Sequence, residues 1–505
     1  MSLSHLRALR TSLIGTLAFA ASGCRSAHDL VPPVDPPPPP PSAPALFPLR
    51  LGAIGPDAAT SVATDLSGNG YVAGTFSGTV DFDGGSGATA RVANGVSDIS
   101  VASYGADGAF RWAYSIGGSD IDAPYVIKVA PDGGVYVTGF VSAGATCNGR
   151  VLRNNGGRDM LLMRLTLNGS CDWAITAGGP GADEGRDLVV DSNGDVLVTG
   201  FFSGIANFNP LAGTALLNSR GGTDGFVARY GADGSFKSVT QFGGTGDDVG
   251  GAIALQIGGD PVVAGSFSST ATFGVAPVVL LASAGGFDYF VARFSPALGL
   301  RWALRGGGPG EDQVGSGGII AGSDGKEYVV GTFSLTANIG SAVVPSHGEG
   351  DLFLVSYDDA GEWTGFAASI GGPGTDSVSA FARDADGNLY LGGTFQQTVD
   401  FDPGVGTHVV TALGSAGAGD GFVLSITKSG DLRWMNPVGA VGSGILSVNL
   451  VGGLSVSTDG SLWTVGRFFG AVDFAPGGTA AVRQALGEGD QFVVRYDQVT
   501  GAIRQ

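Results

Sequence analysis

The chain has 505 residues, of which 45 are Asp or Glu and 26 are Lys or Arg, so its formal net charge is −19 at pH 7. This acidic balance argues against a nucleic-acid partner, because nucleic-acid binding needs clustered Lys and Arg side chains. It argues equally against docking of the folded domain on anionic lipid. Only 14% of the residues are charged and 90 are Gly, which predicts a surface made largely of small polar turns.

Residues 1–23 have the organisation of a bacterial signal peptide. Arg7 and Arg10 precede a short apolar segment, residues 12–21, which is well below the ~20 residues that a membrane-spanning helix needs. The small residues 21–23 before Cys24 resemble a lipobox, so we expect cleavage before Cys24 and lipid attachment to it. The alternative is an ordinary secretory signal with a cysteine at this place by chance. The expected location is the bacterial cell envelope, lipid-anchored at the outer membrane, with the side of the membrane left open.

A proline-rich segment follows the signal peptide. Nine of the thirteen residues from Pro32 to Pro44 are Pro, which favours a stiff polyproline II rod. We expect residues 24–45, the lipidated cysteine and a stalk, to hold a folded domain of residues 46–505 away from the membrane. The alternative is a low-complexity tether without a partner.

One short motif recurs seven times in residues 46–505: an aromatic or aliphatic residue, two small or apolar residues, then Gly. Successive motif glycines are 65, 61, 65, 66, 62 and 73 residues apart. Self-similarity at a long period indicates a repeat architecture, in which each unit buries its apolar face against its neighbours. The motif glycines are Gly74, Gly139, Gly200, Gly265, Gly331, Gly393 and Gly466.

Each repeat contains four β-like segments, here called A to D, and no sustained helical period. In the sixth repeat they are residues 379–384, 389–395, 420–426 and 432–436, separated by Asp, Asn and Gly turns. Four strands in each of seven units predict an all-β, seven-bladed β-propeller. A β-solenoid is the alternative, although its period would be shorter. The expected blades are about 57–118, 122–179, 183–244, 248–308, 312–372, 376–439, and 444–505 together with 46–55.

The two ends of the domain predict how the ring closes. The seventh repeat stops at residues 501–505, where its segment D should begin. Residues 49–55, Leu-Arg-Leu-Gly-Ala-Ile-Gly, stand ahead of the first repeat and are similar to the end of a segment D. We therefore expect residues 46–55 to pair into the last blade, which removes the exposed edge of an open sheet.

Several of these motifs resemble the SBBP-type bacterial β-propeller repeat. They are Gly-Gly-Pro-Gly-Thr-Asp at 371–376, Asp-Gly-Asn-Leu-Tyr at 386–390, Asp-Gly-Phe-Val at 224–227 and the Trp of segment D. The resemblance covers about residues 50–505 and implies a propeller in an envelope or secreted protein, with little on activity. The third repeat departs from it with Ser238 at the Trp position, and the seventh lacks the Gly-Gly-x-Gly-x-Asp loop.

The loop between segment D and the next segment A carries an acidic residue in six blades. Six carboxylates near the mouth of the channel could form a ring that holds a hard cation such as calcium or attracts an ammonium group. The alternative is that each Asp caps its own turn, and repetition in nearly every blade favours this alternative. In the seventh blade Ser443 and Gly444 stand instead. The six residues are Asp57, Asp122, Asp183, Asp248, Asp312 and Asp376.

Two other acidic patterns are better explained by structure than by chemistry. Segment C begins with Asp in all seven blades, which predicts a turn or strand-entry role. Three turns between segments A and B begin like a calcium loop, at Asp65, Asp191 and Asp384, but lack its later Gly and acid, so we expect hairpin turns. The seven segment C residues are Asp98, Asp159, Asp224, Asp288, Asp351, Asp420 and Asp490.

Two further residue sets leave alternatives open. Cys147 lies in the B–C connection of the second blade and Cys171 at the start of its segment D, so a disulfide requires the connection to fold back along the blade edge. The segment D aromatics either form a sugar-stacking platform or, as we expect, pack between neighbouring blades. These aromatics are Trp112, Trp173, Trp302, Trp434 and, in the fifth blade, Phe366.

These observations predict a binding, interaction or structural module without catalysis. The three His residues that follow the signal peptide are far apart in sequence, so no zinc cluster is expected. We expect no cofactor, with calcium as the one candidate, an unknown protein or glycan ligand, and a monomer. Binding would use the acidic face and the variable B–C connections. The alternatives are a polysaccharide hydrolase or lyase with a carboxylate pair at the channel mouth, and a cation-dependent adhesion module.

Overall fold

A computed structural model describes residues 47–84, 89–413, 419–440, 449–475 and 481–504. All of them belong to one compact unit, Pro41–Gln505. The described residues form 40 β-strands and no helix, which confirms the all-β prediction. None of them forms a helix that is long and apolar enough to span a membrane. Cys24, the expected signal peptide 1–23 and the proline-rich stalk lie outside the described residues.

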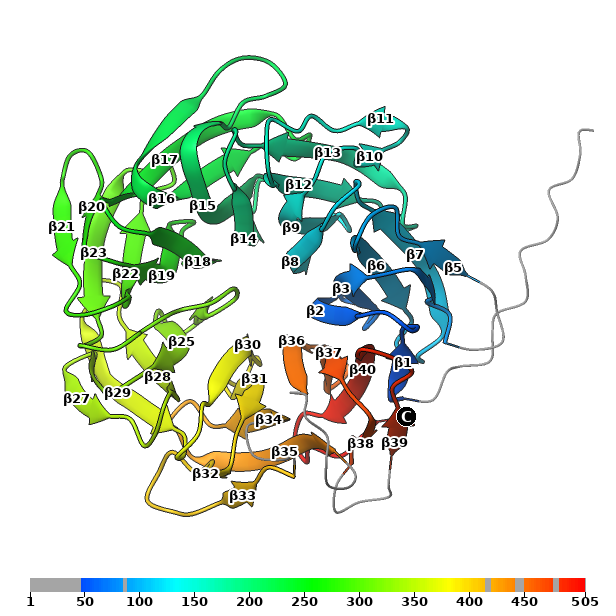
Figure 1. Ribbon diagram of the computed structural model, residues 1–505. Helices are drawn as coiled ribbons and strands as arrows, with labels where there is room; N and C mark the ends of the chain where they lie inside the picture. The colour runs from blue at the N-terminus through cyan, green and yellow to red at the C-terminus, as the bar shows by residue number, and fades with distance from the viewer. Residues whose placement is uncertain (1–46, 85–88, 414–418, 441–448, 476–480, 505) are drawn as a thin grey trace, which may run out of the picture. The chain divides into compact units, whose positions relative to one another are not determined.

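Within this unit, seven antiparallel blades of four strands each are arranged in a ring (Figure 1), so the predicted seven-bladed β-propeller is confirmed. In two of the blades the hairpin of the next blade extends the sheet to six strands. In the first blade the strands run in chain order from the middle of the ring outwards: β2 (Ala58–Thr64), β3 (Gly70–Phe76), β6 (Asp98–Tyr104) and β7 (Phe110–Ile116).

The other six blades repeat this order. Blade two has β8 (Ala123–Val129), β9 (Val135–Val141), β12 (Asp159–Leu165) and β13 (Cys171–Ala177). Blade three has β14 (Glu184–Val190), β15 (Val196–Asn207), β16 (Leu216–Tyr230) and β17 (Phe236–Gly244). Blade four has β18 (Asp248–Leu255), β19 (Pro261–Phe267), β22 (Asp288–Phe294) and β23 (Leu300–Gly306). Blade five has β24 (Ile319–Ala321), β25 (Glu327–Phe333), β28 (Asp351–Tyr357) and β29 (Trp363–Ile370). Blade six has β30 (Ser377–Arg383), β31 (Leu389–Phe395), β34 (Asp420–Ile426) and β35 (Leu432–Ala440). Blade seven has β36 (Leu450–Val456), β37 (Ser461–Phe468), β40 (Asp490–Asp497) and β1 (Leu49–Leu51).

The motif glycine of every second strand lies against the innermost strand of its blade. A Cβ atom at any of the seven positions would lie 1.9–2.4 Å from a carbonyl oxygen of the innermost segment. In six blades the pairing between the first and second strands shifts register at this point, as between Ala59 and Ser61. The resulting β-bulge accompanies the close approach of the two backbones. Only Gly fits such a close approach of two backbones, which explains why the motif ends in Gly in all seven repeats.

The N-terminal strand closes the ring, as predicted. β1 pairs antiparallel with β40, with Leu49 opposite Val493 and Leu51 opposite Gln491, and so becomes the outermost strand of blade seven. The guanidinium of Arg50 lies 2.9 Å from the buried carboxylate of Asp490. The last blade is therefore built from both ends of the domain, and its sheet has no missing outer strand.

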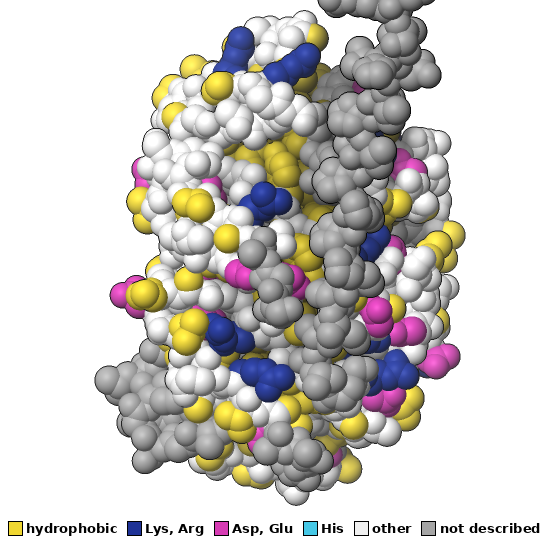
Figure 2. Space-filling model, turned by 90° about the vertical axis from the view of Figure 1, so that its right-hand side faces the viewer, with side chains coloured by type: hydrophobic (Ala, Val, Ile, Leu, Met, Phe, Trp, Pro, Cys, Tyr) yellow, Lys and Arg dark blue, Asp and Glu magenta, His cyan; other side chains and the backbone are white. Residues whose placement is uncertain are grey.

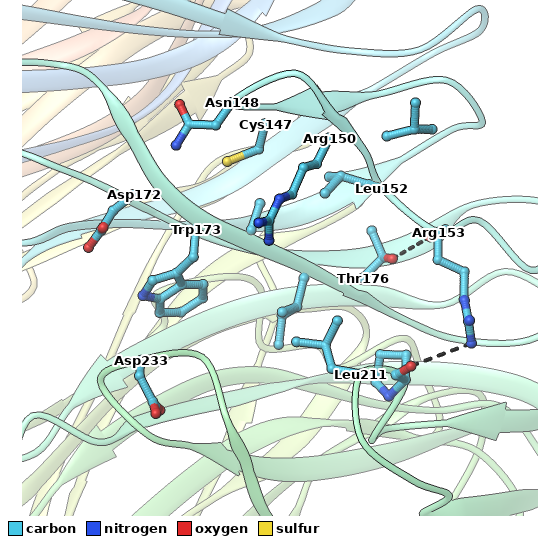
Figure 3. Close-up of a pocket in the computed structure, with 14 residues that line it drawn as sticks. Cys147, Asn148, Arg150, Leu152, Arg153, Asp172, Trp173, Thr176, Leu211 and Asp233 are labelled. Atoms are coloured by element: carbon cyan, nitrogen blue, oxygen red, sulfur yellow. Dashed lines mark hydrogen bonds between the residues drawn. The ribbon is translucent and has the colours of Figure 1, made fainter.

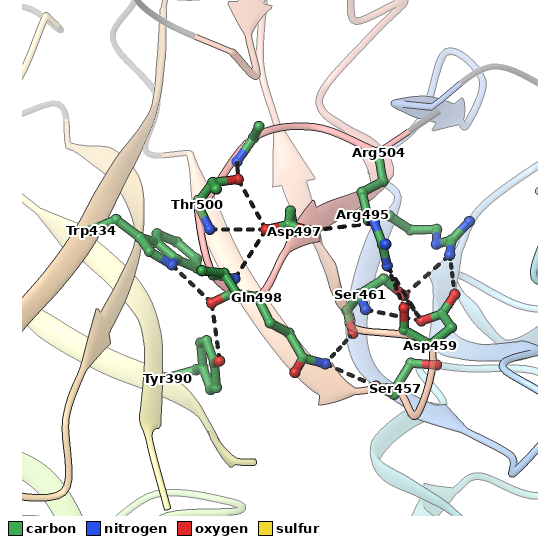
Figure 4. Close-up of polar contacts among 12 residues, drawn as sticks. Tyr390, Trp434, Ser457, Asp459, Ser461, Arg495, Asp497, Gln498, Thr500 and Arg504 are labelled. Atoms are coloured by element: carbon green, nitrogen blue, oxygen red, sulfur yellow. Dashed lines mark hydrogen bonds and ion pairs between the residues drawn. The ribbon is translucent and has the colours of Figure 1, made fainter. Parts of the chain in front are cut away.

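The turn at the end of β40 joins blades six and seven (Figure 4). The indole nitrogen of Trp434 in blade six donates a hydrogen bond to the carbonyl of Gln498 at 3.1 Å. The side-chain amide of Gln498 donates to the carbonyl of Ser461 at 2.9 Å, and Arg495 lies 2.6 Å from the carboxylate of Asp459. These contacts tie the C-terminal residues of the chain to the ring.

Each B–C connection contains a two-stranded hairpin on the outer side of the ring (Figure 1). In blades three to seven the hairpin also bonds to the Gly-Gly or Gly-Ala step after the outermost strand of the preceding blade, as between Gly243 and Thr272. The connections therefore link neighbouring blades, which their variable sequences did not indicate. The hairpin strands are β4 (Thr79–Asp81), β5 (Ala90–Val92), β10 (Thr146–Cys147), β11 (Arg150–Val151), β20 (Thr270–Phe273), β21 (Val279–Ala282), β26 (Thr336–Ile339), β27 (Ala342–Pro345), β32 (Thr398–Asp400), β33 (Val409–Thr411), β38 (Ala471–Asp473) and β39 (Val482–Gln484), and in blade three the ends of β15 and β16.

Candidate functional site

The six aspartates of the predicted acidic ring are buried inside their own loops. Each accepts a hydrogen bond from the backbone amide four residues earlier, at 2.7–2.9 Å, as Asp248 does from Gly244. Asp57, Asp183 and Asp376 also accept from an amide at the start of the B–C connection, at 2.9–3.3 Å. This is the geometry of a turn cap, the alternative that the repetition favoured. Cation binding by this ring stays a prediction.

The seventh blade has an equivalent residue that the sequence analysis missed. The side-chain oxygen of Asn449 accepts a hydrogen bond from the amide of Phe469 at 3.0 Å, as Asp57 does from Ser77. Asn449 stands 17 residues before its motif glycine, the same spacing as Asp57. Counting from the motif glycine would have found it, whereas Ser443 and Gly444 lie outside the described residues.

The aspartates at the start of segment C share the same loops. They are buried, and each accepts a hydrogen bond from a backbone amide a few residues earlier, at 4 residues in most blades, as Asp159 does from Asn155. The two carboxylates therefore lie close together in one loop. A Cβ atom added at Gly178, for example, would lie 2.6 Å from a carboxylate oxygen of Asp159 and 2.6 Å from one of Asp183. The predicted strand-entry role is confirmed.

Burial of these paired carboxylates shifts their titration. It raises the pKa of Asp183 and Asp248 to about 7 and that of Asp57, Asp312 and Asp376 to about 6, and it also raises the pKa of Asp122. Backbone hydrogen bonds partly offset the rise, while the neighbouring segment C carboxylate adds to it. Across the described ranges, no three His, Cys, Asp or Glu side chains come together in a way that could hold a metal ion.

The turns that began like calcium loops are hairpin turns, as predicted. The carboxylate of Asp65 accepts from the amides of Ser67 and Asn69 at 2.9 Å and from the hydroxyl of Tyr71 at 2.9 Å. Asp384 accepts in the same way from the amide of Asn388 and the hydroxyl of Tyr390. The carboxylate oxygens are used within the turn.

The segment D aromatics join neighbouring blades, which confirms the packing prediction. The indole nitrogen of each Trp donates to a carbonyl in the C–D turn of the next blade at 2.7–3.1 Å, as Trp302 does to Asp359. The ring lies against a glycine of the same turn, as Trp302 does against Gly361. In blade five, Phe366 packs on Gly430 without a donor. Repeated in this way, the aromatics serve the ring rather than a sugar platform.

A disulfide joins Cys147 and Cys171, whose Cα atoms are 5.9 Å apart. The B–C connection of blade two therefore does fold back along the blade edge to the start of β13. In blades one, three and seven the hairpin is anchored at this place by a Tyr hydroxyl that donates to a Phe carbonyl, as Tyr104 does to Phe82 at 2.8 Å. The disulfide takes the place of that anchor in blade two, where Leu165 ends the third strand.

The shortened hairpin of blade two leaves a groove on the outer rim of the ring, between β10–β11 and the loop of blade three (Figure 3). The groove has a volume of about 740 Å³. Strand β13 contributes the half-buried Trp173, and the exposed Val151 and Leu211 also line the groove.

Some charged side chains of the groove already have an ion-pair or hydrogen-bond partner, and others do not. Within the described residues the guanidinium of Arg150 has no ion-pair or hydrogen-bond partner, and that of Arg153 contacts only a carbonyl, of Pro210, at 3.4 Å. Asp172 is paired with Arg164, and the hydroxyl and amide of Ser235 bond to Asp233 and lower its pKa. The groove therefore offers two cations without ion-pair partners beside an aromatic ring, together with the carboxylate of Asp233, which is bonded to Ser235.

Basic side chains are not gathered into one area of the described surface that Figure 2 shows. There Lys and Arg stand singly or in small groups, and most of the surface is neither charged nor hydrophobic. The expectation that nucleic acid is not a partner stays a prediction, and this face presents no broad basic stripe that would favour one.

No family model matches the chain. The specific resemblance to the SBBP-type repeat therefore stays a prediction, while the seven-bladed propeller that it implied is observed. The chain is similar to the regulatory protein FlaEY of Caulobacter vibrioides, with 27% identity over 424 residues, which is 79% of this chain. The matched region is 42% of the length of FlaEY.

Solved structures with a related arrangement share little sequence. The Pan2 WD40 domain of Neurospora crassa has 10% identity and a TM-score of 0.38, over 73% of this chain and 88% of its own. A mutant of the GH43 protein BlXynB of Bacillus licheniformis has 12% identity and a TM-score of 0.28, over 90% and 96%. At these TM-scores neither structure bears on what this chain does.

Proposed function

We propose that the chain is a lipid-anchored interaction module whose rim groove binds an acidic segment of a partner protein. One observation carries the proposal: Arg150 and Arg153 face the groove without acidic partners in a chain of net charge −19. Charged groups without partners near an apolar surface favour a ligand of opposite charge. The volume of about 740 Å³ is large enough for a ligand, and the open rim leaves room for an extended peptide to run past it.

Two further observations support an interaction role over catalysis. The paired carboxylates that could have served a hydrolase or lyase are buried in their turns and repeat around the ring. A symmetric set of turn caps is not the asymmetric pair that glycoside hydrolysis requires. The FlaEY relative is named a regulatory protein, and a regulatory role is compatible with a propeller that presents one groove to a partner.

Peptide binding tests the groove. We expect the full chain to bind a labelled peptide of alternating Glu and Leu, and to bind the matched Lys–Leu peptide more weakly, by fluorescence anisotropy. Reversing two charges with Arg150→Glu and Arg153→Glu should weaken the acidic peptide about tenfold, and added salt should weaken it in the wild type. The matched control Lys326→Glu with Lys428→Glu makes the same charge change outside the groove and should leave binding unchanged. Equal binding of both peptides, or an unaffected double variant, would contradict the proposal.

The lipid anchor is tested separately. A lipid on Cys24, placed directly after the small residues 21–23, would hold the chain at the membrane. We expect the wild-type chain to incorporate labelled palmitate and to sediment with the outer membrane, and Cys24→Ser to lose the label. A wild-type chain without label would assign residues 1–23 to an ordinary secretory signal, and a label that persists in Cys24→Ser would place the lipid on another residue.

A further inference from the structure

Blade five departs from the other blades at the middle of the ring. The innermost strand has seven or eight residues in the other six blades, whereas β24 has only three. Asp312 stands 19 residues before its motif glycine, Gly331, two more than in the other blades. The preceding segment 313–318, Gln-Val-Gly-Ser-Gly-Gly, forms a loop instead, and the yellow-green chain before β25 reaches toward the centre of the ring in Figure 1. Sites that bind one ligand need such a break in symmetry.

This loop is held against blade four. The amide of Val314 donates to the hydroxyl of Ser266 at 3.1 Å, and a Cβ at Gly251 would lie 2.2 Å from the Val314 carbonyl. Beneath the loop is a cavity of about 240 Å³ whose lining includes Ser266, Gln313, Ser316 and, from blade three, Arg186. The cavity is thus formed by three different blades.

Arg186 is fixed in position by its neighbours. Its Nη2 lies 3.0 Å from Glu184 Oε2, and its guanidinium carbon lies 4.1 Å from the centre of the Tyr125 ring. Glu184 also pairs with Arg158 at 3.1 Å and accepts from the Tyr125 hydroxyl at 2.8 Å. Two guanidinium groups and one carboxylate leave this cluster with one positive charge at the channel mouth.

The carboxylate of Glu311 accepts from two residues that line the cavity, from the amide of Phe287 at 3.2 Å and from the side chain of Gln313 at 3.4 Å, while other donor groups there have no acceptor among the described residues. Nη1 and Nε of Arg186 have no hydrogen-bond or ion-pair partner there. Among the described residues, the backbone amides of Gly315, Ser316 and Gly317 likewise bond to no acceptor. A glycine-rich loop with free amides beside a fixed guanidinium is an arrangement that binds anions.

We propose that this cavity is a second binding site, separate from the rim groove, which takes a compact ligand with a single carboxylate. A carboxylate oxygen can accept from Nη1 of Arg186, the guanidinium nitrogen that is neither paired with Glu184 nor buried. A monoanion matches the single excess charge of the cluster, whereas a phosphate dianion would exceed it. Two kinds of ligand carry this chemistry, a uronic acid sugar and the carboxylate of a small peptide.

Calorimetry on the full chain distinguishes these ligands. D-galacturonate represents the sugar source and N-acetylglycine the peptide source, with D-galactose as the neutral match and inorganic phosphate as the dianion. We expect saturable binding of at least one carboxylate and none of galactose. Arg186→Gln should weaken the bound carboxylate about tenfold. Arg158→Gln removes the excess charge of the cluster but no group that lines the cavity, and should therefore weaken the carboxylate less than Arg186→Gln does.

A second variant keeps the test valid if Arg186→Gln unfolds the protein. Gln313→Glu adds a negative charge to the exposed lining without touching the Glu184 cluster, and should abolish carboxylate binding while the thermal unfolding curve is retained. Equal binding of galactose and galacturonate, tighter binding of phosphate, or no binding of either carboxylate would overturn the proposal. Loss of peptide binding in the Arg150 and Arg153 variant leaves this site unaffected, so the two proposals fail independently.

Discussion

At the residue scale, the repeated aspartates exchange solvation for backbone hydrogen bonds. Each carboxylate closes a Gly-Gly turn that would otherwise leave backbone amides unpaired, which costs free energy in a buried loop. The arrangement also costs free energy, because it places two buried carboxylates close together, as with Asp224 and Asp248 beside Gly243. The stability of the ring should therefore depend on pH.

The direction of this pH dependence follows from the raised pKa values. The pKa of Asp248 is about 7 in the folded protein against 3.8 normally, so the protonated form is favoured by folding. Its stabilising contribution is full below about pH 4 and is lost as pH rises through about 7. We expect the melting temperature of the full chain to be higher at pH 5.5 than at pH 8.

Asp248→Asn should flatten this pH profile. The amide oxygen can still accept from Gly244 but does not ionise, and one pKa unit corresponds to about 1.4 kcal/mol. The exposed Asp386→Asn is the matched control and should leave the profile unchanged. An unchanged slope in Asp248→Asn would show that this carboxylate does not titrate between these pH values.

A turn cap also predicts that added calcium leaves the melting temperature of the full chain unchanged, whereas a saturable calcium shift would assign a cation site.

At the element scale, the B–C hairpins lie on the outer side of the ring and also connect neighbouring blades. In blades three to seven their strands bond to the end of the outermost strand of the preceding blade or to the residues just after it. In blades one, three, four, six and seven a Phe at the far end of the hairpin is buried. Blade two keeps this arrangement with a covalent bond between Cys147 and Cys171 in place of the aromatic anchor. The short hairpin that results is what opens the rim groove.

Removal of the disulfide should affect both stability and binding. The bond joins residues 24 positions apart, and closing a loop of that length in the unfolded chain contributes about 3 kcal/mol. We expect Cys147→Ser with Cys171→Ser, or reduction of the wild type, to lower the melting temperature and to weaken the acidic peptide at the rim groove. The carboxylate ligand of the channel-mouth cavity should bind as before. Equal melting curves with and without reductant would mean that the hairpin is held without the bond.

At the scale of the whole molecule, three residues of β1 complete a ring of seven blades. Leu49 and Leu51 are buried, and Phe47 packs against Trp463 with ring centres 5.4 Å apart. Without this strand, blade seven would lack its outer edge and expose β40 to solvent.

Leu51→Asp tests the closure. A charged side chain at a position that is 1% exposed cannot be accommodated without displacing β1, so we expect a loss of several kcal/mol and early proteolytic cleavage in blade seven. Leu66→Asp, at a position that is 84% exposed in blade one, is the matched control. Wild-type unfolding of Leu51→Asp would mean that the ring holds without its N-terminal strand.

Much of the architecture could be predicted because it is repeated. The same local structures recur in several blades, and the sequence marks them repeatedly. The marks are seven motif glycines, seven segment C aspartates and four Trp residues at equivalent positions. The channel-mouth cavity and the rim groove could not be predicted in this way. Each of them forms where one repeat differs from the others and where residues of different blades meet in space. A spacing of 19 instead of 17 residues before Gly331 was the one sequence signal of the loop in blade five.

The sequence by itself determined the all-β class, the number of blades and the strand that closes the ring, because these depend on periodicity and on local strand and turn chemistry. Only the tertiary structure decided how the aspartates are used and which side chains meet. Asp183 and Arg186 are three residues apart, yet one is buried under backbone amides and the other faces a cavity between blades. That difference comes from packing between blades, which no single repeat encodes.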